Sequence, residues 1–525
     1  MLRIGIDVGG THTDAALLND DTLLASTKAA TSADVATGIT DAFDAVLAEG
    51  NVAAEDVQCV MIGTTQFTNA VVERRELASV AAIRIGLPSG KGLPPFTDWP
   101  EDIETAIAGM SFMVAGGYLY DGELLAPLDE VAIDQAIAKI AQSSIRNIAI
   151  ASAFSLLNAD PEESVAARIK AAIPDSNITC SHTIGGLGLL ERENAAILNA
   201  SLLPFAKRVV SSFEAALKRR NLNCPLYVSQ NDGTLMGADF VRQFPALTFA
   251  SGPTNSLRGA WKLTGLEDAI VVDIGGTTSD IGVLQSGFPR ESYNIVDIGG
   301  VRTNFRMPDI LAIGVGGGSV VREDGTQIGP QSVGHRLTQE SLIFGGQQLT
   351  LTDIAVAAEA FQLGDPSKVD HIPEAVIKTA RETMHQSLNQ AIDSMRPGGR
   401  KLPVILVGGG AALVTATLDA ATQTIVPDNS GTANAIGAAI AQIGGEAEQM
   451  LSYRDTPRDE ALAMVTAEAE KAAIAAGGDP HGLQVVDVTE TPVPYMDEGA
   501  MRLRVKVVGT LAAMKPQPES KGGIR

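Results

Sequence analysis

The sequence Asp7-Val-Gly-Gly-Thr-His-Thr-Asp14 recurs, with few changes, as Asp273-Ile-Gly-Gly-Thr-Thr-Ser-Asp280. Each copy lies between two short apolar runs. Apolar runs that are joined by a polar, Gly-rich turn predict a β-hairpin. The two copies lie about half of the 525-residue chain apart, so an internal duplication of one architecture explains them better than two chance turns do.

Both turns have the composition of a phosphate-binding loop. Paired glycines let the backbone approach a ligand closely, and consecutive N–H groups in such a turn can cradle an anion. Two such loops that face each other across a cleft would hold a polyphosphate from both sides, whereas one isolated copy could equally be a tight hairpin with structural glycines. The candidate phosphate-binding residues are Gly9, Gly10, Thr11, Thr13, Gly275, Gly276, Thr277 and Thr278.

Charged residues in the turns are candidates for catalysis and metal binding. Asp7 and Asp273 open the two copies and could hold a hydrated Mg²⁺ through oxygen ligands. Asp14 and Asp280 end the copies, and for them we favour a structural role in which they accept backbone N–H bonds. His12 lies in the first turn, where it could donate to a phosphate oxygen; a ring that is turned outward is the alternative.

A third Gly-rich element follows in the second half of the chain. Residues 402–407 have a buried-strand pattern and lead into Gly408-Gly409-Gly410, after which an apolar, helix-forming stretch begins. A junction of strand, glycines and helix would place a helix N-terminus and bare backbone beside the cleft. Gly408, Gly409 and Gly410 are therefore candidates to bind the adenosine part of a nucleotide.

The order of these three elements resembles that of the actin-like ATPase superfamily, which includes sugar kinases, heat-shock chaperones and actin. More narrowly, the chain is similar to the hydantoinase/oxoprolinase family over most of residues 1 to about 510. It departs from that family's pattern at Ile62, where many relatives carry histidine, at His12, where phenylalanine is frequent, and at Asp232, which interrupts an Asn-Gly-Gly turn. The narrower resemblance rests on the segments 63–74, 191–204, 251–253, 316–319, 329–330 and 349–353.

The resemblance implies an α/β fold in which duplicated actin-like, ribonuclease H-like domains surround a nucleotide cleft, with a small α+β appendage at the C-terminus. It implies that ATP and Mg²⁺ are bound, and that the carbonyl oxygen of a cyclic amide such as a hydantoin, 5-oxoproline or another lactam is phosphorylated to activate ring opening. In members that are split into two subunits, a hydantoinase B-like partner completes hydrolysis, so a second subunit and an oligomer are expected.

Two alternatives to this function stay open. The same family hosts ATP-dependent ketone carboxylase subunits, and the fold alone does not specify the acceptor. A non-enzymatic, nucleotide-switched activator of the actin or chaperone type is the second alternative. The sequence has no Ser-His-Asp order, G-x-S-x-G elbow or H-E-x-x-H motif that would suggest unaided amide hydrolysis.

Periodicity suggests three segments, with boundaries near residues 190 and 445: an N-terminal lobe (1–190), a second lobe (191–445) and a C-terminal appendage (446–525). Local patterns predict a helix over 32–49 that Asp34 could cap and a surface loop over 91–101 that could form a flap. They also predict a small-residue helix over 433–439 at a hinge or in tight packing, exposed helices over 446–476 and a disordered tail from Lys515.

Composition narrows the class of protein. The formal net charge of −23 argues against nucleic acids and anionic membranes as partners. Three widely spaced cysteines without C-x-x-C patterns argue against a disulfide scaffold or a zinc site, and His182 and His335 lack a visible ligand set. We see no leader at the N-terminus and no apolar run of ~20 residues, so a cytoplasmic location is expected.

Overall fold

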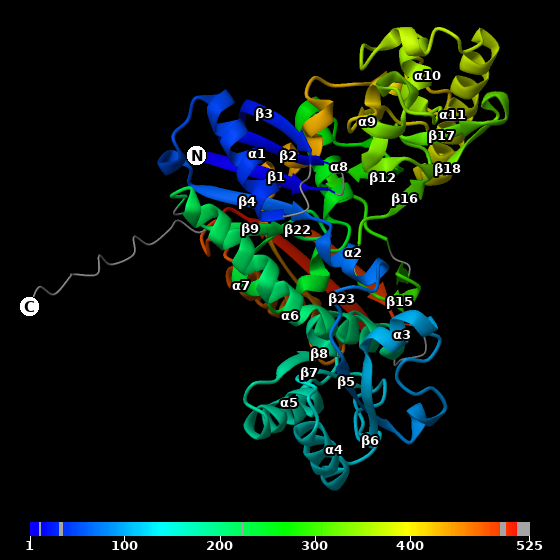
Figure 1. Ribbon diagram of the computed structural model, residues 1–525. Coiled ribbons are helices and arrows are strands. Elements are labelled where there is room, and N and C mark those ends of the chain that lie inside the picture. The colour runs from blue at the N-terminus through cyan, green and yellow to red at the C-terminus, as the bar shows by residue number, and fades with distance from the viewer. Residues whose placement is uncertain are drawn as a thin grey trace, which may run out of the picture.

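The computed structural model describes residues 1–9, 12–30, 35–222, 224–292, 295–305, 307–493 and 500–511. Figure 1 shows three bodies: a large sheet at the centre, a second lobe at the upper right and a smaller sheet at the bottom. Asp34 and the tail from Lys515, for which a cap and disorder are predicted, lie outside the described residues, as do Gly10 and Thr11.

The largest sheet contains the first hairpin. β1 pairs antiparallel with β2 and parallel with β4, and β4 pairs parallel with β9. The C-terminal ends of β1, β4 and β9 therefore meet at one edge of the sheet, which is where α/β proteins place their ligands. Its nine strands, in spatial order, are β22 (Gln484–Pro492), β23 (Ala500–Gly509), β21 (Ile443–Ser452), β10 (Leu235–Gly237), β9 (Leu226–Ser229), β4 (Cys59–Thr64), β1 (Leu2–Val8), β2 (His12–Asn19) and β3 (Thr22–Ala30).

The second sheet repeats this arrangement around the second hairpin. β11 pairs antiparallel with β12 and parallel with β19, as β1 does with β2 and β4. The registers also correspond, because Asp7 lies opposite Asp14 and Asp273 lies opposite Asp280. Both predicted hairpins and the duplicated α/β architecture are thus confirmed. The strands are β13 (Phe288–Pro289), β12 (Ser279–Gln285), β11 (Ala269–Ile274), β19 (Val404–Val407) and β20 (Thr424–Ile425), with β16 (Ile310–Ile313) on β12.

The remaining strands form smaller sheets. The bottom body in Figure 1 has four parallel strands with α4 (Glu130–Gln142) and α5 (Asp160–Ala172) packed beside them. These strands are β6 (Ala108–Ala115), β5 (Val80–Leu87), β7 (Asn147–Ser152) and β8 (Asn177–Cys180). Two hairpins complete the set: β14 (Val296–Ile298) with β15 (Val301–Thr303), and β17 (Ser319–Arg322) with β18 (Gln327–Ser332).

Helices connect these sheets. The long α6 runs along the large sheet toward the bottom body (Figure 1). None of the described helices is both long and apolar enough to cross a membrane. The helices are α1 (Val35–Gly50), α2 (Gln66–Val72), α3 (Glu101–Ile107), α4 (Glu130–Gln142), α5 (Asp160–Ala172), α6 (Leu189–Arg219), α7 (Ala238–Val241), α8 (Ser251–Thr264), α9 (Leu337–Glu340), α10 (Leu351–Ala357), α11 (Glu374–Met395), α12 (Ala433–Ile440) and α13 (Arg458–Ala475).

Helices α8 and α12 lie between the two large sheets. α12 packs on β1 and β2, and α8 packs on β11 and β12. Glycines allow the crossing: a Cβ on Gly259 would lie 1.8 Å from the Ala433 carbonyl oxygen, and one on Gly437 would lie 1.8 Å from the Asn255 carbonyl oxygen. The close crossing that the small residues of 433–439 predicted is confirmed, and it lies between the two hairpins.

Several local predictions need correction. Only a three-residue 3₁₀ turn, Ala411–Leu413, follows the glycines of the third element, so no helix N-terminus lies there. Residues 446–452, which were expected to be helical, form part of β21, because antiparallel pairing with β23 overrides their helix propensity. The predicted loop is observed over 93–100, between η2 (Ser89–Gly92) and α3, and it is anchored, because Trp99 is buried and donates to Asn194 Oδ1 at 2.9 Å.

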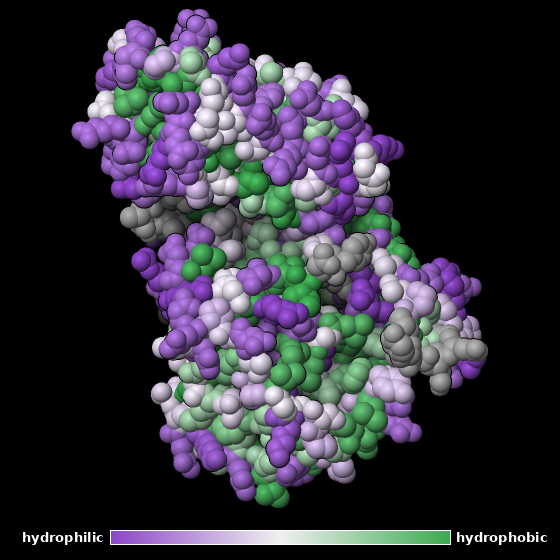
Figure 2. All heavy atoms as spheres, turned by 90° about the vertical axis from the view of Figure 1, so that its right-hand side faces the viewer, coloured by the Kyte–Doolittle hydropathy of each residue, from purple (hydrophilic) through white to green (hydrophobic). Residues whose placement is uncertain are grey.

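The large sheet takes strands from all three predicted segments, and β21, β22 and β23 extend it at one end. The boundaries near 190 and 445 stay a prediction. Figure 2, which views the molecule from the side, shows a hollowed band between the upper lobe and the rest, with hydrophobic patches below it.

Candidate active site

Each hairpin aspartate lies beside a glycine that its neighbouring parallel strand supplies. Asp7 is in register with Gly63 of β4, and a Cβ on Gly63 would lie 2.3 Å from Asp7 Oδ1. In the second lobe, a Cβ on Gly408, just after β19, would lie 2.2 Å from Asp273 Oδ1. Both carboxylates therefore occupy space that a side chain at these glycines would fill, although the register differs by one residue, because Asp273 lies opposite Val407.

Helix α8 contacts both aspartates. Asn255 Nδ2 lies 3.5 Å from Asp7 Oδ1, and Ser256 Oγ donates to Asp273 Oδ2 at 2.5 Å. Asn434, at the start of α12, donates to Asp7 Oδ2 at 3.0 Å. The structure thus brings Asp7 and Asp273 together from opposite halves of the chain, as the paired hairpins predicted.

The carboxylates of the two hairpins disturb one another's ionisation. Burial and the nearby charge of Asp14 raise the pKa of Asp7 to about 6. Burial and Asp273 raise the pKa of Asp280 to about 7, and burial raises that of Asp273 as well. Lys28 pairs with Asp14 at 2.7 Å. Clustered carboxylates with raised pKa values are typical of functional sites.

This donor set fits a hydrated divalent cation. Carboxylate oxygens are the ligands that Mg²⁺ prefers, and a bound cation would favour the ionised forms that burial disfavours. Asp14 was expected to accept backbone N–H bonds. Instead, its two carboxylate oxygens each accept a hydrogen bond from Lys28 Nζ.

Each of the two turns is closed by an equivalent backbone hydrogen bond. Gly9 N donates to His12 O at 3.0 Å, and Gly275 N donates to Thr278 O at 2.9 Å. In the second turn, Gly276, Thr277 and Thr278 are exposed. This exposure leaves the tip of the second hairpin accessible to a phosphate.

The first turn differs in what it exposes. His12 is exposed over part of its surface. Burial of the rest of the side chain, together with the nearby charge of Lys28, lowers its pKa. Thr13, in contrast, is fully buried in β2. Its counterpart Ser279 is also buried and donates to Val315 O at 2.6 Å.

A second Gly-rich loop supports the second hairpin. Gly317 N donates to Gly275 O at 3.0 Å, and Gly318 N donates to Gly276 O at 2.7 Å. A Cβ on Gly316 would lie 2.8 Å from the Thr277 backbone. The segment 316–319 therefore holds the turn in place from behind.

The third element lies against the second hairpin. Gly408 has a φ of +84°, and Gly410 N donates to Ile274 O at 2.8 Å. A Cβ on Gly409 would meet no atom within 4 Å, so this position faces open space. Gly409 is thus the residue of this loop that a ligand can approach most closely.

Models of one protein family match two regions of the chain. The hydantoinase/oxoprolinase N-terminal region matches residues 3–173, and the hydantoinase/oxoprolinase region matches residues 192–362. The chain belongs to the hydantoinase/oxoprolinase family. The two regions between them contain both hairpins and the whole of α8.

Two curated proteins are similar in sequence to this hydantoinase/oxoprolinase chain. The caprolactamase subunit alpha of Pseudomonas jessenii is 25% identical over 433 residues, which cover 75% of this chain and 60% of that protein. The acetophenone carboxylase gamma subunit of Aromatoleum aromaticum is 24% identical over 397 residues, which cover 67% of this chain and 52% of that protein. The chain thus spans between half and three fifths of the length of these relatives.

Solved structures confirm the fold. The ATP-dependent caprolactamase from Pseudomonas jessenii superposes with a TM-score of 0.77 at 18% identity, covering 98% of this chain and 88% of that chain. A nucleotide-free acetone carboxylase superposes with a TM-score of 0.68 at 17% identity, covering 99% of this chain and 89% of that chain.

Sequence reasoning missed the residues that hold the aspartates of this hydantoinase/oxoprolinase family member. Asn255 and Ser256 are buried polar residues just after the family segment 251–253, and Asn434 lies in the small-residue helix 433–439. Small polar residues within these two small-residue helix starts were the signal that could have revealed them.

Proposed function

We propose that this chain binds ATP with Mg²⁺ between its two hairpins and phosphorylates the carbonyl oxygen of a cyclic amide, which activates the ring for opening. The observation that carries this proposal is the convergence of Asp7 and Asp273 on helix α8, with raised pKa values in a cluster of carboxylates. A hydrated cation that neutralises a polyphosphate fits this cluster.

ATP would supply the phosphoryl group, and Mg²⁺ would offset its charge. Asp7 and Asp273 would hold the hydrated cation as carboxylates, oriented by Asn255 and Ser256. In the transfer, the bond between the terminal phosphorus and the bridging oxygen breaks, a bond to the amide carbonyl oxygen forms, and ADP leaves. Phosphate contacts are assigned to the two turns (Gly9, Gly10, Thr11, His12, Gly275, Gly276, Thr277 and Thr278), and adenosine contacts to Gly408, Gly409 and Gly410. Thr13, which the sequence also offered as a phosphate ligand, is fully buried and is left out.

A cyclic amide is favoured as the acceptor because the longer of the two curated alignments is to a caprolactamase subunit. Both curated relatives are named as subunits, which supports a second, hydantoinase B-like subunit that completes ring opening. A cytoplasmic location stays part of the proposal. A ketone carboxylase subunit is the second candidate, supported by the match to the acetophenone carboxylase gamma subunit.

The test is phosphate release from ATP and Mg²⁺ by the purified chain, alone and with a co-purified partner. Hydantoin, 5-oxoproline, a simple lactam, and acetone with bicarbonate are compared as acceptors. Stimulation by a cyclic amide without bicarbonate is the expected result. Stimulation only by a ketone with bicarbonate would favour the carboxylase, and phosphate release that responds to neither class, with or without the partner, would contradict both.

A further inference from the structure

A row of charged side chains crosses the large sheet beside the first hairpin. Asp7 on β1 lies opposite Asp14 on β2, and Asp14 lies opposite Lys28 on β3. Residues that lie opposite one another on neighbouring strands point to the same face of the sheet, with their Cβ atoms about 5 Å apart. The row therefore places the Lys28 ammonium on the same face as the Asp7 carboxylate.

This face of the sheet is turned toward the second half of the chain. At one end of the row, Asn434 at the start of α12 donates to Asp7 Oδ2 at 3.0 Å. At the other end, Ser26 Oγ lies 3.5 Å from Asn429 Oδ1, in the loop after β20. Because Ser26 precedes Lys28 by two residues on the same strand, the two side chains share that face. Lys28 thus lies on the side of the sheet that carries the candidate active site.

Lys28 is held by a buried carboxylate but is itself open. Its Nζ contacts Asp14 Oδ1 at 2.7 Å and Oδ2 at 2.8 Å. The Asp14 side chain is 4% exposed, whereas that of Lys28 is 34% exposed. An ammonium has three donors, and the third has no partner among the described residues. Asp14 therefore fixes the position of a cation that a ligand can still reach.

The charge of Lys28 reaches both hairpins. Burial raises the pKa of Asp273, and the nearby Lys28 acts in the opposite direction. Burial lowers the pKa of His12, and Lys28 lowers it further. Asp273 and His12 belong to different hairpins, so the ammonium lies within electrostatic reach of both.

The second hairpin has no equivalent of Lys28 in its row. Its Asp280 lies opposite Asp273 on one side and opposite Ala312 of β16 on the other. Burial and the charge of Asp273 raise the pKa of Asp280 to about 7, as expected for a carboxylate without a cation beside it. The duplicated architecture is therefore asymmetric in charge, with the ammonium at the first hairpin.

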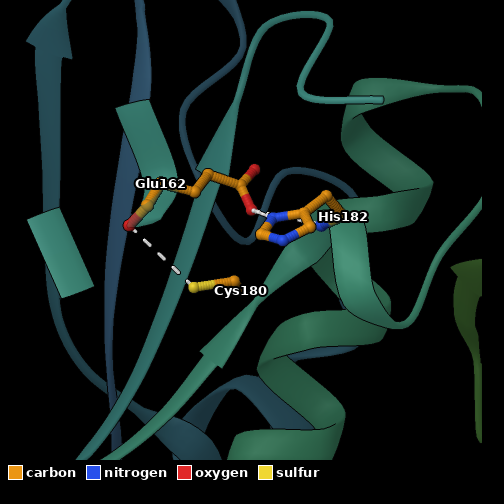
Figure 3. Close-up of side chains that lie close together, drawn as sticks. All are labelled: Glu162, Cys180 and His182. Atoms are coloured by element: carbon orange, nitrogen blue, oxygen red, sulfur yellow. Dashed lines mark hydrogen bonds and ion pairs between the residues drawn. The ribbon is translucent and has the colours of Figure 1, made fainter. Parts of the chain in front are cut away.

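A cluster of titratable groups in the bottom body is, in contrast, closed by its own contacts. Figure 3 shows the fully buried Glu162 beside His182, with Oε2 2.8 Å from Nδ1. The same carboxylate also accepts from His182 N, Ser152 N and Ser181 Oγ, and these four contacts fill its acceptor positions. Burial raises the pKa of the nearby Cys180 thiol to about 12, so the thiol stays protonated and the group does not fit a metal ion.

The cavity of about 520 Å³ that His182 lines is also surrounded by committed charges. Asp232 and Glu446 line it, and each is paired: Asp232 with Lys506 at 2.9 Å and Glu446 with Arg504 at 2.8 Å. Both cations are buried, with 7% of each side chain exposed. Lys28 differs from them, because its carboxylate partner is buried while the cation is open.

An open ammonium beside a cation site favours an anion between the two charges. The proposed Mg²⁺ site consists of Asp7 and Asp273, and Lys28 would repel a cation there unless negative charge lies between them. The terminal phosphate of ATP carries such charge, and during the transfer this charge is spread over three oxygens that a donor can approach.

We propose that Lys28 donates to the terminal phosphate of ATP and stabilises its charge during the transfer. This inference rests on the proposed function. The ammonium keeps its contact with Asp14 and uses its third donor for a phosphate oxygen, so it acts by charge and hydrogen bonding without losing its proton. The first hairpin then distinguishes ATP from ADP, which lacks that phosphate.

The experiment is calorimetric titration of the full chain with Mg²⁺ and either ADP or a non-hydrolysable ATP analogue. Lys28→Met is expected to weaken binding of the ATP analogue about 10-fold, the scale of one hydrogen bond to a charged group, and to change the affinity for ADP less than about twofold. ATP turnover is expected to fall about 10²-fold. Lys139→Met, which removes an exposed lysine of α4, is the control and should change none of these quantities.

Two further variants separate this role from a purely structural one. If Lys28 only balanced the charge of Asp14, Lys28→Met combined with Asp14→Asn would regain affinity for the ATP analogue, because no unpaired carboxylate would remain. We expect no such recovery. Lys28→Gln, which can still donate a hydrogen bond to Asp14, is expected to lose the preference for the ATP analogue over ADP as Lys28→Met does.

An unchanged preference for the ATP analogue in both Lys28→Met and Lys28→Gln would overturn the assignment, as would recovery in the double variant. Thermal unfolding midpoints show whether a loss of binding reflects misfolding of Lys28→Met, in which case Lys28→Gln carries the test. Failure of the proposed function is distinguishable, because the wild-type chain would then not bind the ATP analogue, and that result would overturn both.

Discussion

Asn255 and Ser256 are neighbours on helix α8, yet they contact carboxylates from opposite halves of the chain. Asn255 Nδ2 lies 3.5 Å from Asp7 Oδ1, and Ser256 Oγ lies 2.5 Å from Asp273 Oδ2. Successive side chains on a helix point about 100° apart. Because α8 lies between the two sheets, two neighbouring residues at its start therefore reach the two hairpins. A movement of one lobe relative to the other would therefore change the relation between the two aspartates.

Removal of the Ser256 hydroxyl should weaken the proposed cation site. Hydrogen bonds to charged groups contribute about 1.5–3 kcal/mol, and without this one Asp273 is ionised less readily. Ser256→Ala is expected to raise the Mg²⁺ concentration for half-maximal ATP turnover by about 10-fold. Thr264→Ala, at the far end of the same helix, should leave that concentration unchanged, since Thr264 Oγ1 contacts local backbone there, donating to Ala260 O at 2.8 Å and accepting from Leu266 N at 3.3 Å. Equal behaviour of the two variants would contradict the role of Ser256.

Replacement of Asp273 tests the second hairpin directly. Asp273→Ala is expected to lower ATP turnover by about 10²-fold or more, the scale on which a key electrostatic element acts. Asp393→Ala, which removes a half-exposed carboxylate paired with Arg396, is the control and should keep normal turnover. Near-normal turnover of Asp273→Ala would exclude the hairpin from the reaction.

Asp7 should destabilise the nucleotide-free protein near neutral pH. Its folded pKa of about 6 lies above the ordinary value of 3.8, so its favourable contribution to stability is complete below pH 3.8 and is lost as the pH rises through 6. At pH 8 this costs the folded state about 3 kcal/mol. Asp7→Asn is expected to raise the thermal midpoint at pH 8 while it lowers ATP turnover.

Two comparisons sharpen that measurement. The exposed Asp41→Asn should leave both the midpoint and the turnover unchanged. Mg²⁺ with an ATP analogue should raise the midpoint of the wild-type chain more than that of Asp7→Asn, because the cation favours the ionised carboxylate. A midpoint for Asp7→Asn at or below that of the wild-type chain at pH 8 would refute the prediction that the ionised Asp7 carboxylate destabilises the folded chain.

Gly63 should tolerate no side chain. A Cβ would lie 2.3 Å from Asp7 Oδ1 and 2.4 Å from Asn255 Nδ2, so Gly63→Ala must displace the carboxylate. We expect about 10²-fold lower ATP turnover, measured beside the thermal midpoint. Gly431→Ala is the control, because a Cβ there meets no atom within 4 Å. Turnover within twofold of the wild type for Gly63→Ala would show that the carboxylate position is unimportant.

The buried Lys506 should be essential for stability. Its ammonium lies between Asp232 at 2.9 Å and Glu291 at 3.1 Å. Although burial acts against the charged lysine, these two carboxylates raise its pKa, and Lys506 in turn lowers the pKa of Asp232. The contribution of Asp232 is therefore present above pH 3.8 and is lost as the pH falls through its folded pKa, whereas that of Lys506 is lost only as the pH rises above 10.5.

Lys506→Met leaves the largely buried Asp232 without its cation, while Glu291 keeps its contact with Arg504, and is expected to cost about 3–5 kcal/mol in urea unfolding. The double variant with Asp232→Asn should recover part of that loss. Lys471→Met, an exposed change on α13, should have no measurable effect. A loss for Lys506→Met no larger than for Lys471→Met would show that the ion cluster contributes nothing to stability.

The local sequence pattern was sufficient to predict the two hairpins. Asp7 to Asp14 and Asp273 to Asp280 each carry the glycines and flanking apolar runs that such a turn needs, and the observed registers agree. The order of the motifs was sufficient for the family and the duplicated α/β fold. Local pattern was insufficient at 446–452, where strand pairing with a distant segment overrides a helical preference.

What the sequence by itself determined was therefore the set of short-range features: two Gly-rich turns, their aspartates and the strands that carry them. Only the tertiary structure decided which residues meet those aspartates, because Asn255, Ser256 and Asn434 reach them through the crossing of α8 and α12 between two sheets. The same holds for the cavity that His182, Asp232 and Glu446 line together, whose walls come from distant segments. Side-chain chemistry is local, but burial and contact between distant residues depend on how the sheets and helices pack.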